Sequence, residues 1–275
     1  MELLKKIFQE AQKDRLTAEA AKAAYYFFLS FFPTILALFA LTGILGGDAA
    51  FTWIMDQLYA ALPGEAASYL SRFVLEVTGQ DRPGLLSLAL LLTLWAASNV
   101  FVAIAEGLNV VYDIEEGRSW WKRRVIALAA LLASLILLSA ATAALVAGPE
   151  LISLLRLAPV WHVLRWPLAF VLLTAMMWLI YYLLPNREQG RAWRPNLIGA
   201  LVGSSVWVLG TLGFRLYVAN FADYSRTYGF VGGIVVLLLW LYLTAVAILL
   251  GGEVAATLEQ ERARRSNERN SYTES

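Results

Sequence analysis

The chain has 275 residues, of which 59% are hydrophobic and 16% charged, with a formal net charge of +1. Soluble domains contain about 45–50% apolar and about 25% charged residues, so this composition argues against a water-soluble globule and against a disordered chain. Nor does the charge provide the basic field that nucleic-acid binding requires. With no Cys and one His, we expect no disulfide, no metal and no cofactor.

Long segments without any charged residue are the strongest signal. They are 23–47, 83–105, 125–149, 166–186, 195–214 and 227–252. About 20 helical residues cross a hydrocarbon core of about 30 Å, and each segment reaches that length. The pattern predicts an all-α, polytopic membrane protein with six transmembrane helices, at about 23–47, 84–110, 125–148, 163–184, 196–219 and 229–255.

The basic residues predict the orientation of these spans. Sixteen of the 22 Lys and Arg fall on the side that carries both ends of the chain, five fall on the other side, and Arg215 lies within the fifth span. Positive charge is retained in the cytoplasm, so we expect both termini to be cytoplasmic. The chain then divides into a cytoplasmic segment at 1–22, a membrane domain at 23–257 and a polar cytoplasmic tail at 258–275.

The segment 48–82 is the longest connection on the outer side. Apolar residues recur there at spacings of three and four on both sides of Pro63 and Gly64, which predicts two amphipathic helices at the outer surface. This segment contains five acidic residues but only two Arg. The segment is therefore either a lid on the membrane interface or an acidic vestibule that concentrates cations.

Polar residues inside the second span form a stripe. Asn99, Glu106 and Asn109 share one helix face because their separations are close to whole numbers of turns. A polar side chain within lipid needs a partner or water, so it usually faces the interior of the bundle. The stripe is a candidate substrate path, and the alternative is a seam of interhelical hydrogen bonds.

Three further charges are isolated at the ends of spans. Lys22, Glu106 and Glu253 are expected at one depth, where they could form either an ion-paired latch or a gate linked to proton movement. Arg215 lies near the outer end of the fifth span. Its side chain either extends to the membrane interface or contacts a lipid headgroup or a substrate anion.

Several short runs carry a family resemblance. They are YYFFLSFFP at 25–33, WAASN at 95–99, GLN at 107–109, LPN at 184–186, YGFVGG at 228–233 and LGGE at 250–253. In these runs the chain resembles the YihY/BrkB family of bacterial inner-membrane proteins, over roughly residues 15–257. The resemblance implies a six-helix membrane protein. Members have carried a ribonuclease BN label, a virulence label and suggestions of lipid or osmolyte transport, without agreed catalytic residues to carry over.

The residues favour a transporter over an enzyme. There is no nucleotide-binding loop and no zinc-binding helix motif, and one His cannot supply the clustered ligands of a metal-dependent ribonuclease. We expect a passive or ion-coupled transporter of a lipid or small amphipathic or polar solute, with membrane lipids as partners. The rival is a non-transporting scaffold or envelope-integrity protein. Gly199 and Gly203 form a small-residue pair that permits close helix contact and would allow a homo-oligomer.

The topology is directly testable because the chain contains no Cys. A single Cys introduced between residues 52 and 78 is expected to react with an impermeant thiol reagent from outside the cell, and one introduced at 262–270 is expected to react only after lysis. Reaction of the tail from outside would overturn the predicted orientation.

Overall fold

The chain is all-helical over the part that the structure describes. This computed structural model describes residues 2–45, 83–154, 158–187, 192–220 and 222–273, which hold seven helices and no strand. The predicted outer helices at 48–82 lie outside the described residues. The helices are α1 (Glu2–Lys13), α2 (Leu16–Leu45), α5 (Pro83–Val111), α6 (Trp120–Leu154), α7 (Ala158–Leu183), α8 (Trp193–Asn220) and α9 (Ala222–Thr273).

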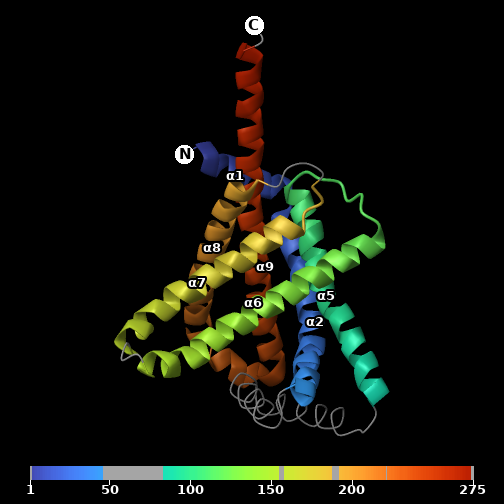
Figure 1. The fold of residues 1–275 in the computed structure, drawn as a ribbon, viewed down its shortest axis with the longest axis vertical. Helices are drawn as coiled ribbons and strands as arrows, with labels where there is room; N and C mark the ends of the chain where they lie inside the picture. The colour runs from blue at the N-terminus through green and yellow to red at the C-terminus, as the bar shows by residue number, and fades with distance from the viewer. Residues whose placement is uncertain (1, 46–82, 155–157, 188–191, 221, 274–275) are drawn as a thin grey trace.

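Four helices form an upright bundle that two others cross. In Figure 1, α2, α5, α8 and α9 run along the long axis, and the hairpin of α6 and α7 passes obliquely in front of them. The hairpin contacts the bundle through α5 on one side and α8 on the other. Both ends of the chain lie at the same end of the bundle (Figure 1), which we call the terminal end.

The six long helices coincide with the six charge-free segments. Within the described residues, four of these helices contain a stretch long and apolar enough to cross a membrane: Thr93–Val111, Val163–Leu183, Trp193–Val218 and Gly232–Arg265. Large apolar side chains on these stretches, such as Val171, Leu209 and Leu239, face outward. Such a surface is unfavourable in water and suits hydrocarbon, as expected for a helical membrane protein.

The two ends of the chain are helical, which the sequence analysis did not predict. The segment 1–22 holds α1 and the first turns of α2, joined at Arg15, whose φ of 49° is the left-handed conformation of a helix C-terminus. The tail beyond residue 258 continues α9 to Thr273. Its Glu, Gln and Arg residues are good helix formers, and Arg264 pairs with Glu268 one turn away at 3.1 Å.

The closest packing joins α8 to α9. A Cβ atom at Gly199 would overlap the Gly251 carbonyl, and one at Gly251 would overlap the Tyr181 hydroxyl. Tyr181 is fully buried and donates a hydrogen bond of 2.7 Å to the Ile248 carbonyl, which attaches α7 to α9 at the same level. The Gly199 and Gly203 face of α8 is therefore occupied by α9 of the same chain.

Two glycines make a matched test of this contact. Gly251→Ala forces α8 and Tyr181 away from α9 and is expected to destabilise the protein by about 1–3 kcal/mol, as overpacking does. Gly213→Ala is the control, because a Cβ atom there meets nothing within 4 Å. That variant should be neutral or slightly stabilising. Thermal unfolding in detergent measures both, and equal effects would contradict the close contact.

Candidate functional site: a polar seam at the terminal end of the bundle

The three polar residues of the α5 stripe all have partners within the protein. Asn99, Glu106 and Asn109 point to three different groups of residues, from α6, from α2 and α6 together, and from the loops at the terminal end. Helical spacing places them on one side of α5, as the sequence predicted. Each of them therefore has its own local chemistry.

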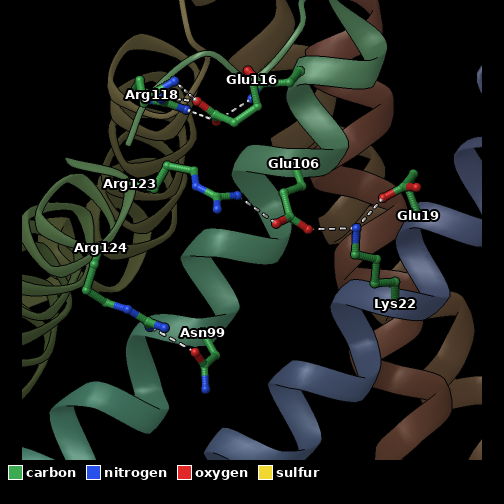
Figure 2. Close-up of polar contacts among 9 residues, drawn as sticks. Glu19, Lys22, Asn99, Glu106, Glu116, Arg118, Arg123 and Arg124 are labelled. Atoms are coloured by element: carbon green, nitrogen blue, oxygen red, sulfur yellow. Dashed lines mark hydrogen bonds and ion pairs between the residues drawn. The ribbon is translucent and has the colours of Figure 1, made fainter. Parts of the chain in front are cut away.

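Glu106 joins three helices through its carboxylate. Lys22 of α2 places its Nζ 2.7 Å from Oε2, and Arg123 of α6 places its Nη1 3.4 Å from Oε1 (Figure 2). Glu19 contacts the same lysine nitrogen at 3.4 Å. These side chains remain 23–39% exposed, so water and salt moderate the attraction between them. The group can position α2, α5 and α6 relative to one another.

Arg124 provides the partner for Asn99. Its Nη1 donates to Asn99 Oδ1 at 2.8 Å and to Ser98 Oγ at 2.6 Å, and the guanidinium lies 4.1 Å from the centre of the Trp95 ring. Figure 2 shows the side chain reaching from α6 across to α5. The residue is 9% exposed, so these contacts replace most of its hydration. A guanidinium stacked on Trp and hydrogen-bonded at its edge is a stable arrangement in a water-poor setting.

Asn109 organises the loop that follows α5. Its Nδ2 donates to Glu116 at 2.8 Å, and its Oδ1 accepts a bond of 2.8 Å from the backbone nitrogen of Asn186. Glu116 in turn holds Arg118 at 2.6 Å. Burial opposes ionisation of Glu116, but its bonds with Arg118 and Asn109 outweigh burial and hold the pKa of this carboxyl below its usual range. Its stabilising contribution is therefore present at neutral pH and lost as the pH falls through that lowered pKa.

A second buried arginine closes the terminal end. Arg187 donates to Glu259 of α9 at 2.8 Å and to Asn196 of α8 at 3.2 Å, and it stacks 3.9 Å from the centre of the Tyr112 ring. Its side chain is 5% exposed. Burial raises the pKa of Tyr112, so its hydroxyl stays protonated and donates to Asn196 at 3.3 Å. One side chain thus links α5, α8 and α9.

The predicted cluster of Lys22, Glu106 and Glu253 assembles only in part. Lys22 and Glu106 meet, while neither forms an ion pair or hydrogen bond with Glu253 in the part of the chain that is described. Glu253 is 1% exposed, and Thr257 of the same helix lies 3.4 Å from its Oε1. The sequence predicts the position of Glu253 along its span but not the direction in which its side chain points from α9.

Arg215 lies far from these polar side chains at the terminal end. It sits on the exposed surface of α8 towards the end opposite the termini, and no described residue pairs with it.

Sequence reasoning missed Arg124 and Arg187, because both were counted as cytoplasmic loop charges. A signal was present in each case. Trp120 and Trp121 precede the first arginine, and Pro185–Asn186 precedes the second. Aromatic neighbours and a tight turn both favour an arginine folded back onto the protein. Among the described residues, no three His, Asp or Glu are grouped so that they could hold a metal ion.

The fold and the seam define a class: a helical membrane protein whose terminal end is joined by buried arginines. Comparison with known proteins identifies the family within this class. Residues 7–274 match the profile of the family described as Virulence factor BrkB, and the chain belongs to that family. No solved structure matches this chain.

Three relatives illustrate the breadth of the similarity. The ribonuclease-like protein YfkH of Bacillus subtilis (strain 168) is 31% identical over 95% of this chain and 97% of its own length. A UPF0761 membrane protein of Rhodospirillum centenum is 29% identical over 90% of this chain, which spans 55% of that relative. One from Aeromonas salmonicida is 27% identical over 92% of this chain and 87% of its own length. These names support a membrane protein and name no transported substrate.

Substitution of Arg187 tests whether the terminal end depends on it. Arg187→Met leaves Glu259 without its cation and is expected to destabilise the protein by about 3 kcal/mol, the lower end for breaking a buried pair, because Glu259 is 26% exposed. The double variant with Glu259→Met should recover part of that loss. Arg264→Met is the control, because Arg264 is 82% exposed and should cost under about 0.5 kcal/mol in thermal unfolding.

Proposed function

We propose that the protein is a transporter of the inner membrane, with six spans and both termini in the cytoplasm. Its cargo would be a lipid or a small amphipathic or polar solute, moved passively or with an ion. The observation that carries the proposal is the contact between α5 and α6, where Arg123 and Arg124 are held by Glu106 and Asn99. The common position of the two termini in Figure 1 supports the orientation.

The α5–α6 contact differs in kind from the α8–α9 contact. Glycine backbones meet between α8 and α9, and separating them would leave a void that no ligand matches. Between α5 and α6, the interaction depends on two guanidinium groups and their acceptors. A phosphate or carboxylate can replace those acceptors bond for bond, because arginine binds such groups in the same planar geometry.

This exchange gives a physical route for opening. A charged group leaving the seam within the membrane is costly unless another partner takes its place. An anionic headgroup that enters between α5 and α6 would supply that partner to Arg123 and Arg124, while its apolar part stays in lipid. The α6–α7 hairpin, which crosses the bundle obliquely in Figure 1, is the element that would move.

A structural role is the second candidate, and one observation favours it. Asn99, Glu106 and Asn109 all have protein partners, and neither the cavity between α6, α7 and α8 nor the one beside Arg187 is lined by them. On this view the stripe is a hydrogen-bond seam that holds an envelope-integrity protein together. Neither candidate gives the chain a catalytic role, and the ribonuclease-like name belongs to the relative.

Cross-linking across the seam tests the transporter proposal. The rings of Trp95 and Trp120 lie 5.2 Å apart, so Cys at both positions can be joined by a short bis-maleimide in this otherwise Cys-free chain. The measurement is movement of fluorescent phospholipids, and of a panel of osmolytes, across sealed liposomes that contain the purified protein. The cross-link is expected to abolish flux of the transported compound, because α6 can no longer leave α5.

The matched control joins α5 to α2 instead of α6. Ser30 donates a hydrogen bond of 2.7 Å to the Ala96 carbonyl, so the variant Ser30→Cys with Ala96→Cys takes the same reagent beside Trp95. Flux should persist there after cross-linking. Equal flux with and without the Trp95–Trp120 link would show that the seam does not open. Absence of flux for every lipid and solute in the unmodified protein would favour the structural role.

A further inference from the structure

A second feature lies on the other side of the α6–α7 hairpin. Helices α6, α7 and α8 line a half-open cavity of about 470 Å³ within the predicted membrane depth. All but one of the side chains around it are apolar, and that one is Thr211. The lining residues on which the argument depends are Leu137, Ala169, Phe170, Trp207, Thr211 and Leu212.

The surroundings of the cavity indicate what can fill it. Trp166 is 69% exposed, Leu209 69% and Leu216 68% on the outward surfaces of α7 and α8. Such surfaces face lipid in a membrane protein, so the cavity adjoins hydrocarbon chains and not bulk water. A water molecule needs two or more polar partners, and this lining offers one hydroxyl. An acyl chain from the surrounding bilayer is the occupant that matches the lining.

Polar groups at one side of the cavity indicate how a ligand would be oriented in it. The Thr211 hydroxyl is buried and has no hydrogen-bond partner among the described residues. Arg215 follows four residues later on α8, about 6 Å further towards the end opposite the termini. Arg165 precedes the cavity residue Trp166 on α7, and its Nε is also buried without a partner in the described part.

We propose that this cavity is a binding site for an acidic glycerophospholipid. Along such a lipid, the acyl chain is followed by an ester carbonyl and then by a phosphate. Along α8, the apolar cavity is followed by Thr211 and then by Arg215, so the order of the chemical groups matches. The acyl chain fills the cavity, the ester accepts the Thr211 hydrogen bond, and the phosphate lies at Arg215 with Arg165 on its other side.

This site is tested separately from transport through the α5–α6 contact, although the α6–α7 hairpin that would move in transport forms part of its wall. Its residues lie on α6, α7 and α8, and the lipid can remain bound while the seam stays closed. Binding is measured without any flux assay. Failure of the lipid site would therefore leave the transporter proposal standing, and failure of transport would leave the lipid site standing.

Native mass spectrometry of the full-length protein tests the site. The protein, purified in detergent, is titrated with phosphatidylglycerol and, separately, with phosphatidylcholine of identical chains. Both lipids carry the phosphate, but the choline cation of phosphatidylcholine cancels its negative charge and is repelled by Arg215. Phosphatidylglycerol should therefore bind at least about tenfold more tightly, which is about the value of one charge-assisted contact. Arg215→Gln is expected to remove most of the preference. Ala169→Phe, which places a ring in the cavity, is expected to weaken both lipids.

Controls separate binding from folding. Arg262→Gln removes an exposed arginine from the far end of α9 and should leave both affinities unchanged. The melting temperature of each variant in lipid-free detergent shows whether it is folded. Equal affinity of the unmodified protein for the two lipids would overturn the proposal. A preference for phosphatidylglycerol that survives both Arg215→Gln and Ala169→Phe in folded variants would also overturn it.

Discussion

Helices α8 and α9 approach so closely at Gly199 and Gly251 that neither position has room for a Cβ atom. This contact places α9 at the centre of the described bundle, because the same helix also packs against α2 and α5. Tyr181 bonds to the α9 backbone beside these glycines, and Leu108 of α5 occupies the space that a side chain at Gly252 would need. Dispersion contacts of this density tolerate little change in side-chain volume, so the rest of the fold is built on a nearly rigid core.

The terminal end is joined by a different kind of interaction. Arg124 and Arg187 each replace water with an aromatic ring and oxygen acceptors, one between α5 and α6 and the other between α5, α8 and α9. Only Arg187 belongs to an ion pair, because the acceptors of Arg124 are uncharged. Such buried polar contacts contribute little net stability compared with apolar packing, but losing one partner is costly. They therefore specify which helices meet, and they leave the α5–α6 contact open to competition from an outside anion. The rigid core and the exchangeable seam meet on α5.

The sequence predicts the helices well because hydrocarbon leaves the backbone few options. Absence of charge over about 20 residues is sufficient to place a helix, and the described part of each of the six segments is helical except for residues 184–186, which follow the end of α7. Depth along a span also anticipates that Lys22 and Glu106 lie close together. Depth alone does not predict which way a side chain faces. Glu253, which was expected beside Lys22 and Glu106, instead faces the packed core. The roles of Arg124 and Arg187 depend on contacts between distant segments, which a count of loop charges does not contain.

Helix α9 runs without interruption from Ala222 to Thr273, and it projects beyond the other helices in Figure 1. From Glu253 to the last helical residue it extends about 30 Å at the usual rise per residue. A straight helix acts as a lever about its fixed point, which here is the glycine contact with α8. A tilt of about 10° in the membrane would displace the far tip by about 5 Å. Glu261, on the first part of this arm, is 3.4 Å from Lys6 of α1, so movement of the arm and of the N-terminal helix would be mechanically coupled.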